Sequence, residues 1–227
     1  MEKDQTVLTA EGRAYDLVLE FLKGEIAAGR LKLGDKLPSE RSMMARLELG
    51  RNSVREALRQ LENTGFLRSV HGQGSFLVNE AGRGFSAVFS MLLLLNQTDW
   101  GEFWQLRRTL ETAALAAAAA SPDSEALACM ERAVEAMECA DSMETLDQVE
   151  EAFHQALLAG GGNRLFRLIQ EALADLSRAY RRQTLTSLDE TVRAPLCATH
   201  RRILQALRAG DAAAGMDALE EHFRLIR

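Results

Sequence analysis

Three histidines and one glutamate in the C-terminal half have the types and spacing that could bind a metal ion. Glu150 and His154 are four residues apart in a helical pattern, so both side chains project from one helix face. His200 and His222 lie on two predicted helices that meet at Gly210. His200 lies ten residues before this hinge and His222 eleven or twelve after it, so at about 1.5 Å per residue an antiparallel pair places both at one height. We therefore expect these four side chains to form one three-histidine, one-carboxylate site.

Imidazole and carboxylate groups suit Zn²⁺, Ni²⁺ or a similar divalent ion. Four protein ligands can leave positions open for water or for an anionic ligand. Two uses of such a centre besides ligand sensing stay open. It could activate water in a hydrolase, or the ion itself could be the signal in a metal sensor. For any one histidine taken alone, a surface position or a hydrogen-bonded core position is the simpler interpretation.

A second group of residues, within 37–78, has the pattern of a DNA-reading element. Ser39 precedes an apolar helical run and is a typical helix N-cap. Gly50 interrupts the run as in a tight turn between helices, and a second helix should begin near Asn52, with Asn52 or Ser53 as its cap. Two short apolar strands follow around a turn with two glycines. Two helices across a short turn followed by a β-hairpin predict a winged helix-turn-helix.

The exposed face of that second helix carries side chains that suit base edges in the major groove. Arginine pairs with guanine and asparagine with adenine, and the first residues of a recognition helix reach the bases. Arg41, at the start of the preceding helix, is placed to grip a phosphate. His71, in the glycine-rich hairpin tip, could enter the minor groove. The residues predicted to meet the major groove are Arg51, Asn52, Ser53 and Arg55.

The charge distribution agrees with a local DNA-binding surface. The chain has 227 residues and a net charge of −6. Residues 1–79 hold 12 Lys and Arg against 11 Asp and Glu, whereas the remainder holds 15 against 22. An acidic remainder would repel DNA, so two copies should be needed for tight binding. The chain has no apolar run long enough to cross a membrane and no export signal pattern, and its three cysteines form no CxxC motif, so we expect a cytoplasmic protein.

The pattern of breaks predicts a mainly α fold with two domains. We expect a winged helix-turn-helix DNA-binding domain over 1–78, a linker over 79–84 (NEAGRG), and an all-α bundle of six or seven helices over 85–227. Core packing explains most of the apolar run 91–95 and the two tryptophans, and a self-association face is the alternative. The predicted helices of the bundle span 85–95, 100–120, 123–140, 144–159, 163–183, 189–208 and 212–226.

The N-terminal motifs resemble a known family. LPSER, then LGRNSVREALRQL, then GFL and HGQGSFL are similar to the DNA-binding domain of GntR-type bacterial transcription regulators over about residues 13–78. The resemblance implies that five residues occupy the family's DNA-contacting positions. They are Arg41, Arg51, Arg55, His71 and Gly72.

The C-terminal half resembles the FCD ligand domain that accompanies this winged helix in the FadR subfamily. FWQLRRTLETAALAAAAA, EEAFHQALLAGGGNRLF and HRRILQALRAGDAAAGMDALEEH carry the resemblance over about 85–227. It implies the metal ligands Glu150, His154, His200 and His222, with glutamate where aspartate is usual. It also implies that Arg107 binds the effector, with Arg108 as the rival, since a guanidinium can fork onto a carboxylate.

We expect, on this basis, a cytoplasmic homodimeric repressor that binds a near-palindromic operator in double-stranded DNA. A small carboxylic acid effector, bound at the metal and at Arg107, would release it. A metal-free relative of the acyl-CoA-binding type is a further alternative, and the three histidines argue against it.

Overall fold

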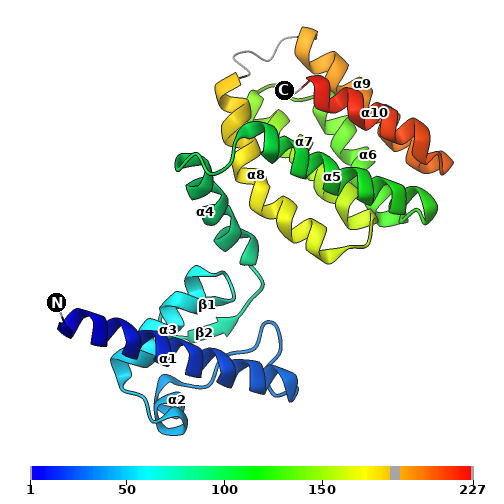
Figure 1. The fold of residues 1–227 in the computed structure, drawn as a ribbon. Coiled ribbons are helices and arrows are strands. Elements are labelled where there is room, and N and C mark those ends of the chain that lie inside the picture. The colour runs from blue at the N-terminus through cyan, green and yellow to red at the C-terminus, as the bar shows by residue number, and fades with distance from the viewer. Residues whose placement is uncertain (1, 185–189, 226–227) are drawn as a thin grey trace. The chain divides into compact units, whose positions relative to one another are not determined.

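The computed structural model describes residues 2–184 and 190–225, and contact clustering divides the chain into two compact units, Met1–Phe85 and Ser86–Arg227. The described residues are mainly helical with a single β-hairpin, as predicted (Figure 1). Within them, no helix combines the length and apolar character that a membrane crossing requires.

The first unit has the winged helix-turn-helix architecture that the sequence predicts. Its helices are α1 (Glu2–Ala27), α2 (Glu40–Leu47) and α3 (Arg51–Asn63). Strands β1 (Leu67–Val70) and β2 (Gly74–Leu77) pair antiparallel, with Leu67 opposite Leu77, and form the wing. Apolar side chains from all these elements make one core, which includes Val18, Met43, Val54, Leu58, Leu61, Leu67 and Leu77.

The turn between α2 and α3 differs in detail from the sequence prediction. Glu48 ends α2 in the left-handed conformation (φ 56°), and Gly50 is the N-cap of α3 without a side-chain hydrogen bond. The expectation that Asn52 or Ser53 caps α3 is therefore wrong. Because α3 begins at Arg51, both residues lie inside its first turn, where the Asn52 side chain is exposed.

Helix α4 (Ala81–Leu94) begins inside the segment predicted as a linker and crosses the division between the units. Its start is packed closely on the end of α3. A Cβ atom on Gly65, which has φ +80°, would lie 2.1 Å from the carbonyl oxygen of Glu80, and one on Gly84 would lie 3.0 Å from that of Thr64. This packing holds residues 80–84 in place within the first unit.

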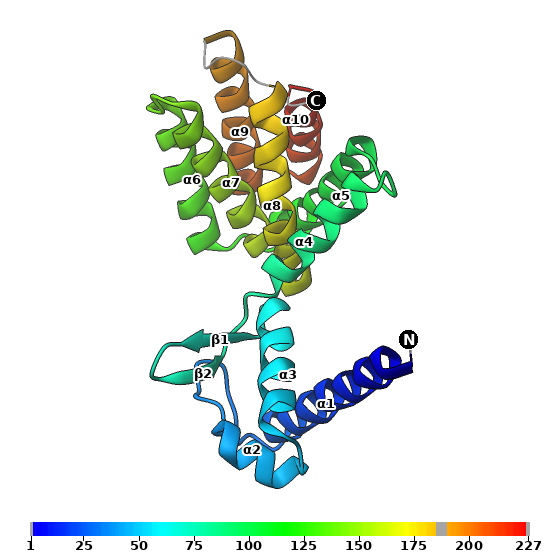
Figure 2. The same ribbon diagram turned by 90° about the vertical axis from the view of Figure 1, so that its left-hand side faces the viewer.

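The second unit is a helical bundle in which α5 contacts α7, α8, α9 and α10. Helices α9 and α10 form an antiparallel pair that turns at Gly210 (φ +68°), and both ribbon views show them side by side (Figures 1 and 2). The helix ends predicted at 189 and 226 lie outside the described residues. After α4, the helices are α5 (Trp100–Ala120), α6 (Ser124–Glu138), α7 (Met143–Gly160), α8 (Arg164–Thr184), α9 (Glu190–Ala209) and α10 (Ala212–Leu225).

Small residues allow the bundle helices to approach closely where the alanine-rich end of α5 crosses α7. A Cβ atom on Gly161 would lie 2.7 Å from the Cα of Ala114, and Ala114, Ala118 and Ala119 are buried. Trp104 is also buried in this core, whereas Met91 and Leu94 of α4 are exposed. Helix α5 packs against α7, α9 and α10, so one face of α5 lies beside the three helices that carry the histidines.

Candidate nucleic-acid interface and candidate metal centre

The seven residues predicted to contact DNA lie on three neighbouring elements of the first unit. Arg51, Asn52 and Arg55 are exposed on α3, and Ser53 is half-buried there. Arg41 is exposed in the first turn of α2, whose N-cap Ser39 accepts a hydrogen bond from the backbone N–H of Ser42. His71 and Gly72 are exposed in the turn between the strands of the wing.

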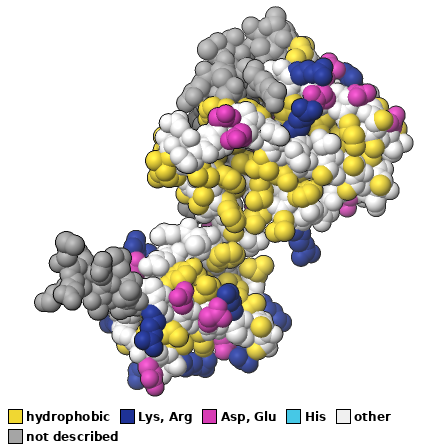
Figure 3. Space-filling model, in the orientation of Figure 1, with side chains coloured by type: hydrophobic (Ala, Val, Ile, Leu, Met, Phe, Trp, Pro, Cys, Tyr) yellow, Lys and Arg dark blue, Asp and Glu magenta, His cyan; other side chains and the backbone are white. Residues whose placement is uncertain are grey.

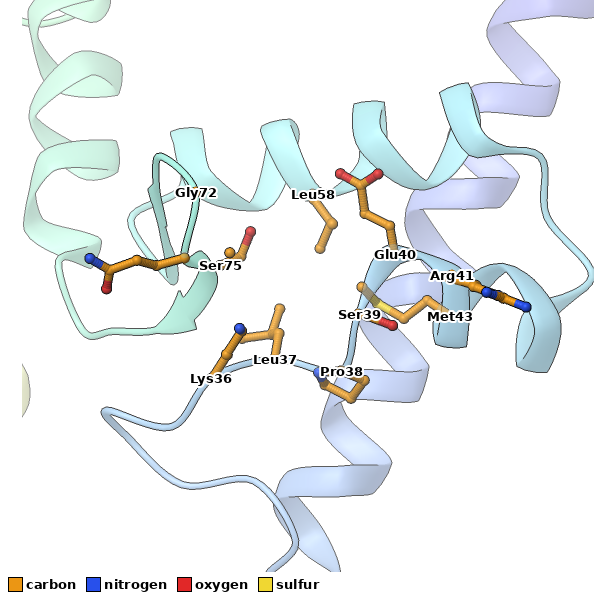
Figure 4. Close-up of a pocket in the computed structure, with 12 residues that line it drawn as sticks. Lys36, Leu37, Pro38, Ser39, Glu40, Arg41, Met43, Leu58, Gly72 and Ser75 are labelled. Atoms are coloured by element: carbon orange, nitrogen blue, oxygen red, sulfur yellow. The ribbon is translucent and has the colours of Figure 1, made fainter.

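A hollow of about 380 Å³ separates the wing from the start of α2. Figure 4 shows Gly72 on its wing side and Ser39 and Arg41 on its helix side. Lys36 also lines the hollow. Backbone amides at a helix start, a glycine-rich turn and two cations form the kind of surface that receives a phosphate backbone.

The structure adds Glu40, which the sequence interpretation did not assign. Both carboxylate oxygens of Glu40 accept hydrogen bonds from Nε of Arg55, at 3.1 and 2.9 Å, and one lies 3.8 Å from Nε of Arg51. These groups are exposed, and exposed ion pairs contribute little to stability. Glu40 therefore holds the two arginines over the face of α3 without burying them. Its place at the start of the preceding helix gave no sequence signal for this contact.

The four residues predicted as metal ligands come together in the second unit. One ligating atom from each of Glu150, His154, His200 and His222 lies within 4.8 Å of the others, and all four side chains are buried. Helix α7 carries Glu150 and His154, while α9 and α10 carry one histidine each. Nε2 of His154 lies 3.3 Å from Nε2 of His200 and 3.0 Å from Oε1 of Glu150. The glutamate side chain thus reaches the cluster.

Hydrogen bonds on the far side of two imidazoles fix which nitrogen faces the cluster. Nδ1–H of His154 donates to Oε2 of Glu111 at 2.6 Å, and Nδ1–H of His200 donates to the carbonyl of Leu196 at 2.7 Å. Each Nε2 is therefore directed into the cluster, which is the usual orientation of a metal-binding histidine. Among the described residues, neither ring nitrogen of His222 has a hydrogen-bond partner. A buried imidazole without hydrogen bonds is unfavourable unless something else binds it.

Burial keeps two histidines of the cluster neutral, and neighbouring carboxylates keep the third protonated. Burial lowers the pKa of His200 to about 4 and the pKa of His222 well below its ordinary value, and neighbouring histidines add to both effects. Burial also disfavours the charged form of His154, but the charges of Glu111 and Glu150 outweigh it and raise the pKa of His154 to about 9. A metal ion would therefore compete with a proton only at His154.

Arg107, and not its neighbour Arg108, lies beside the cluster. Arg107 is fully buried, its Nε donates to Oε1 of Glu111 at 2.8 Å, and its Nη1 donates to Ser177 at 3.2 Å. Nη2 has no hydrogen-bond partner among the described residues and lies 3.6 Å from Oε1 of Glu150. Arg108 is partly exposed and pairs with Glu220.

Glu111 and Ser177 are the residues of this site that the sequence interpretation missed. Glu111 follows Arg107 by four residues, a spacing that places both on one helix face. That spacing was a usable signal, but it is also the spacing of ordinary surface ion pairs. Ser177 lies on α8, 70 residues from Arg107, and no local pattern marks it.

The fold and these two sites together define a DNA-binding transcription regulator with a winged helix-turn-helix and a separate helical regulatory domain. Residues 14–77 match the bacterial regulatory proteins of the gntR family, and residues 102–225 match the FCD domain. The chain belongs to the GntR family, in the FadR subfamily that carries an FCD domain.

Curated relatives and solved structures agree with this assignment. The chain is 29% identical over 205 residues to the HTH-type transcriptional regulator LutR of Bacillus subtilis, a match that covers 87% of this chain and 92% of LutR. It is 28% identical over 170 residues to the HTH-type transcriptional repressor NanR of Salmonella newport, covering 73% of this chain and 65% of NanR. A GntR structure from Streptococcus agalactiae shares the fold, with a TM-score of 0.70, 21% identity and coverage of 95% of this chain and 98% of that one. The family and these relatives are transcription regulators and not enzymes, which removes the hydrolase alternative.

Proposed function

We propose that this regulator is a cytoplasmic, homodimeric repressor whose helical domain binds a divalent metal ion and a small carboxylic acid. Arg41, Arg51, Asn52, Ser53, Arg55, His71 and Gly72 would contact the operator. Glu150, His154, His200 and His222 would hold the metal ion, and Arg107 would bind the acid. The observation that carries the proposal is the convergence of these four buried ligand side chains beside a buried arginine.

The residues present fit a borderline divalent ion such as Zn²⁺ or Ni²⁺. Three imidazoles and one carboxylate are a suitable ligand set, and neither ring nitrogen of His222 has a hydrogen-bond partner among the described residues. When bound, such an ion supplies positive charge and open coordination positions for an anionic ligand. Without an ion, burial of these polar side chains is unfavourable, because buried polar groups require partners.

Arg107 is suited to the carboxylate of an effector because one of its donors remains available. Glu111 accepts a hydrogen bond from Nε and Ser177 accepts one from Nη1, and these two bonds hold the guanidinium in place. The third nitrogen, Nη2, lies 3.6 Å from Oε1 of Glu150. The indole of Trp104 lies 5.5 Å from the guanidinium carbon and forms an apolar wall. These surroundings favour a small acid with one carboxylate at the arginine.

Two copies of the chain are proposed because the operator of a symmetric regulator is read as two half-sites. An exposed apolar face, formed by Val88, Met91 and Leu94 of α4 and by Leu95 directly after it, supports self-association of the second unit. Figure 3 shows apolar side chains gathered over α4 and α8 on this face of the second unit.

Effector binding would lower the affinity for operator DNA. By linkage, an acid that lowers the affinity for operator DNA by a given factor must bind the DNA-bound protein more weakly than the free protein by the same factor. We propose that residues 79–84 carry this change between the two units. We take the repressor sign from the related transcriptional repressor NanR.

The test combines the metal content with operator binding. Protein purified without chelator is analysed for metal, and a duplex selected from random-sequence DNA is titrated with the metal-loaded and metal-free protein, each with and without a panel of small carboxylic acids. We expect about one divalent ion per chain, a near-palindromic selected site, and release of DNA by one acid only when metal is present.

Arg107→Gln should abolish the response to acid, and Arg108→Gln is its matched control because Arg108 lies outside the cluster. Tighter DNA binding on addition of acid would contradict the repressor sign. A response to metal alone, unchanged by every acid, would favour the metal-sensor alternative.

A further inference from the structure

Glu111 makes two hydrogen bonds that join the predicted effector arginine to one of the predicted metal ligands. Its Oε1 accepts from Nε of Arg107 at 2.8 Å, and its Oε2 accepts from Nδ1 of His154 at 2.6 Å. All three side chains are fully buried. The bond to His154 spans 43 residues of sequence and two helices, α5 and α7.

This geometry makes each contact depend on the other. A carboxylate buried away from water is unfavourable unless its oxygens are paired, and here each oxygen has a different partner. A rotation of Glu111 that kept the bond to His154 and lost the bond to Arg107 would leave the buried Nε–H of Arg107 without its acceptor, and the reverse rotation would release the imidazole. The three side chains therefore have one shared arrangement that satisfies them all.

We propose that Glu111 is a positioning residue that couples the metal centre to the effector arginine. It fixes His154 with Nε2 toward the cluster, and it holds Arg107 through Nε, so that Nη2 is available to the effector. This inference rests on the proposed function, since it assumes that the cluster holds a metal ion and that Arg107 binds an acid.

The coupling follows from the chemistry of imidazole. A metal ion bound at Nε2 fixes the position of the imidazole ring and keeps its Nδ1–H directed at Glu111. Glu111 is then held more firmly against Arg107, and the guanidinium is better ordered for the acid. By reciprocity, acid binding at Arg107 raises the affinity of the cluster for the metal by the same factor.

Glu111→Gln is the informative substitution because it preserves the size of the side chain. The amide has one oxygen and one NH₂ group, so it can accept from His154 or from Arg107, but it then presents a donor to the other. Glu220→Gln is the matched control, since Glu220 forms partly exposed pairs with Arg108 and Arg224, away from the cluster. Thermal unfolding and binding to the selected duplex establish that each full-length variant is folded.

The experiment measures Co²⁺ and Zn²⁺ affinity, the visible absorption spectrum of the Co²⁺ form, and acetate affinity with and without Zn²⁺. We expect Glu111→Gln to weaken metal binding by about 10- to 100-fold, as loss of such a supporting hydrogen bond usually does. It should also change the Co²⁺ spectrum and bring the effect of Zn²⁺ on acetate affinity close to none. Glu220→Gln should behave as the wild type in all three measurements.

A second measurement does not depend on metal. In the metal-free wild type, Nδ1–H of His154 should give a downfield proton resonance in the NMR spectrum, and Glu111→Asp, whose shorter arm cannot reach both partners, should shift or abolish it. A folded Glu111→Gln protein with wild-type metal affinity, spectrum and acetate response would overturn the inference while the proposed function stands. A wild type that binds neither metal nor acetate would overturn both.

Discussion

Metal binding to the histidine cluster should release one proton from His154 and should strengthen as the pH rises toward 9. The pKa of His154 is raised to about 9 because the charges of Glu111 and Glu150 outweigh its burial, so Nε2 carries a proton at pH 7. The pKa of His200, about 4, leaves that ring neutral. Well below pH 9, each further pH unit downward therefore weakens metal binding about tenfold, or by about 1.4 kcal/mol. Between pH 7 and pH 9 the gain is about 2.3 kcal/mol, roughly 50-fold, because half of the His154 rings are still protonated at pH 9.

The stability of the metal-free protein should change with pH in the opposite direction. A histidine whose folded-state pKa is raised contributes stability that is complete below its unfolded value near 6.5, and that is lost as the pH rises through about 9. Metal-free protein should therefore become less stable from about pH 6.5 to pH 9, while the stability of the metal complex changes little, because His154 is unprotonated both in the complex and in the unfolded chain. The difference between the two unfolding curves isolates the cluster from other titrating groups.

Isothermal titration calorimetry with Zn²⁺ in buffers of different ionisation enthalpy gives the number of protons released, and competition with a chelator gives the affinity at each pH. We expect close to one proton at pH 7 and less than half a proton above pH 9. His71→Ala, which removes the exposed histidine of the wing, is the control and should change nothing. An affinity that stays level from pH 6.5 to pH 8.5, with no proton released, would refute the reasoning.

Three further predictions concern DNA binding, assembly and the packing of α4. In fluorescence anisotropy titrations, Arg55→Ala should weaken operator binding by about 1–3 kcal/mol and change its salt dependence. The control Arg30→Ala, outside the predicted interface, should have little effect. Equal losses of operator affinity in the two variants would contradict the assignment. Leu94→Glu places a charge on the exposed apolar face of α4 and should shift the protein to monomer in analytical ultracentrifugation; an unchanged dimer would place the interface elsewhere. Gly65→Ala should destabilise the protein by more than about 2 kcal/mol in urea unfolding, since Gly65 has a φ of +80° and the new Cβ would meet a backbone carbonyl. The control Gly24→Ala, at a position with open space around it, should be neutral or stabilising. Equal effects of the two substitutions would refute the packing argument.

The convergence of the histidines was predictable because helix geometry is rigid. Counting residues from the hinge at Gly210 gave the heights of His200 and His222, since the rise per residue in a helix is nearly constant. The four-residue spacing of Glu150 and His154 fixed their common face in the same way. The winged helix-turn-helix was predictable for a similar reason, because its apolar periodicity and its two turns follow in a fixed order.

The remaining features depend on packing, which no local pattern specifies. Glu111 and Arg107 have the spacing of a solvated surface pair, and only the approach of α5 to α7 and α10 shows that both are buried. The start of α4 was predicted four residues too late, because the glycines of 79–84 resemble a flexible linker. Gly84 is needed instead for the close contact with the end of α3. Gly50 caps α3 through its backbone conformation, while the better capping residues that follow it lie within the helix.

The most direct test of the central claim is an anomalous diffraction map of crystals grown from the metal-loaded protein, recorded on both sides of the absorption edge of that metal. The account predicts one peak per chain at coordination distance from imidazole nitrogens of His154, His200 and His222 and from a carboxylate oxygen of Glu150. A peak bound by other residues, or fully loaded protein with no peak at these four side chains, would contradict it.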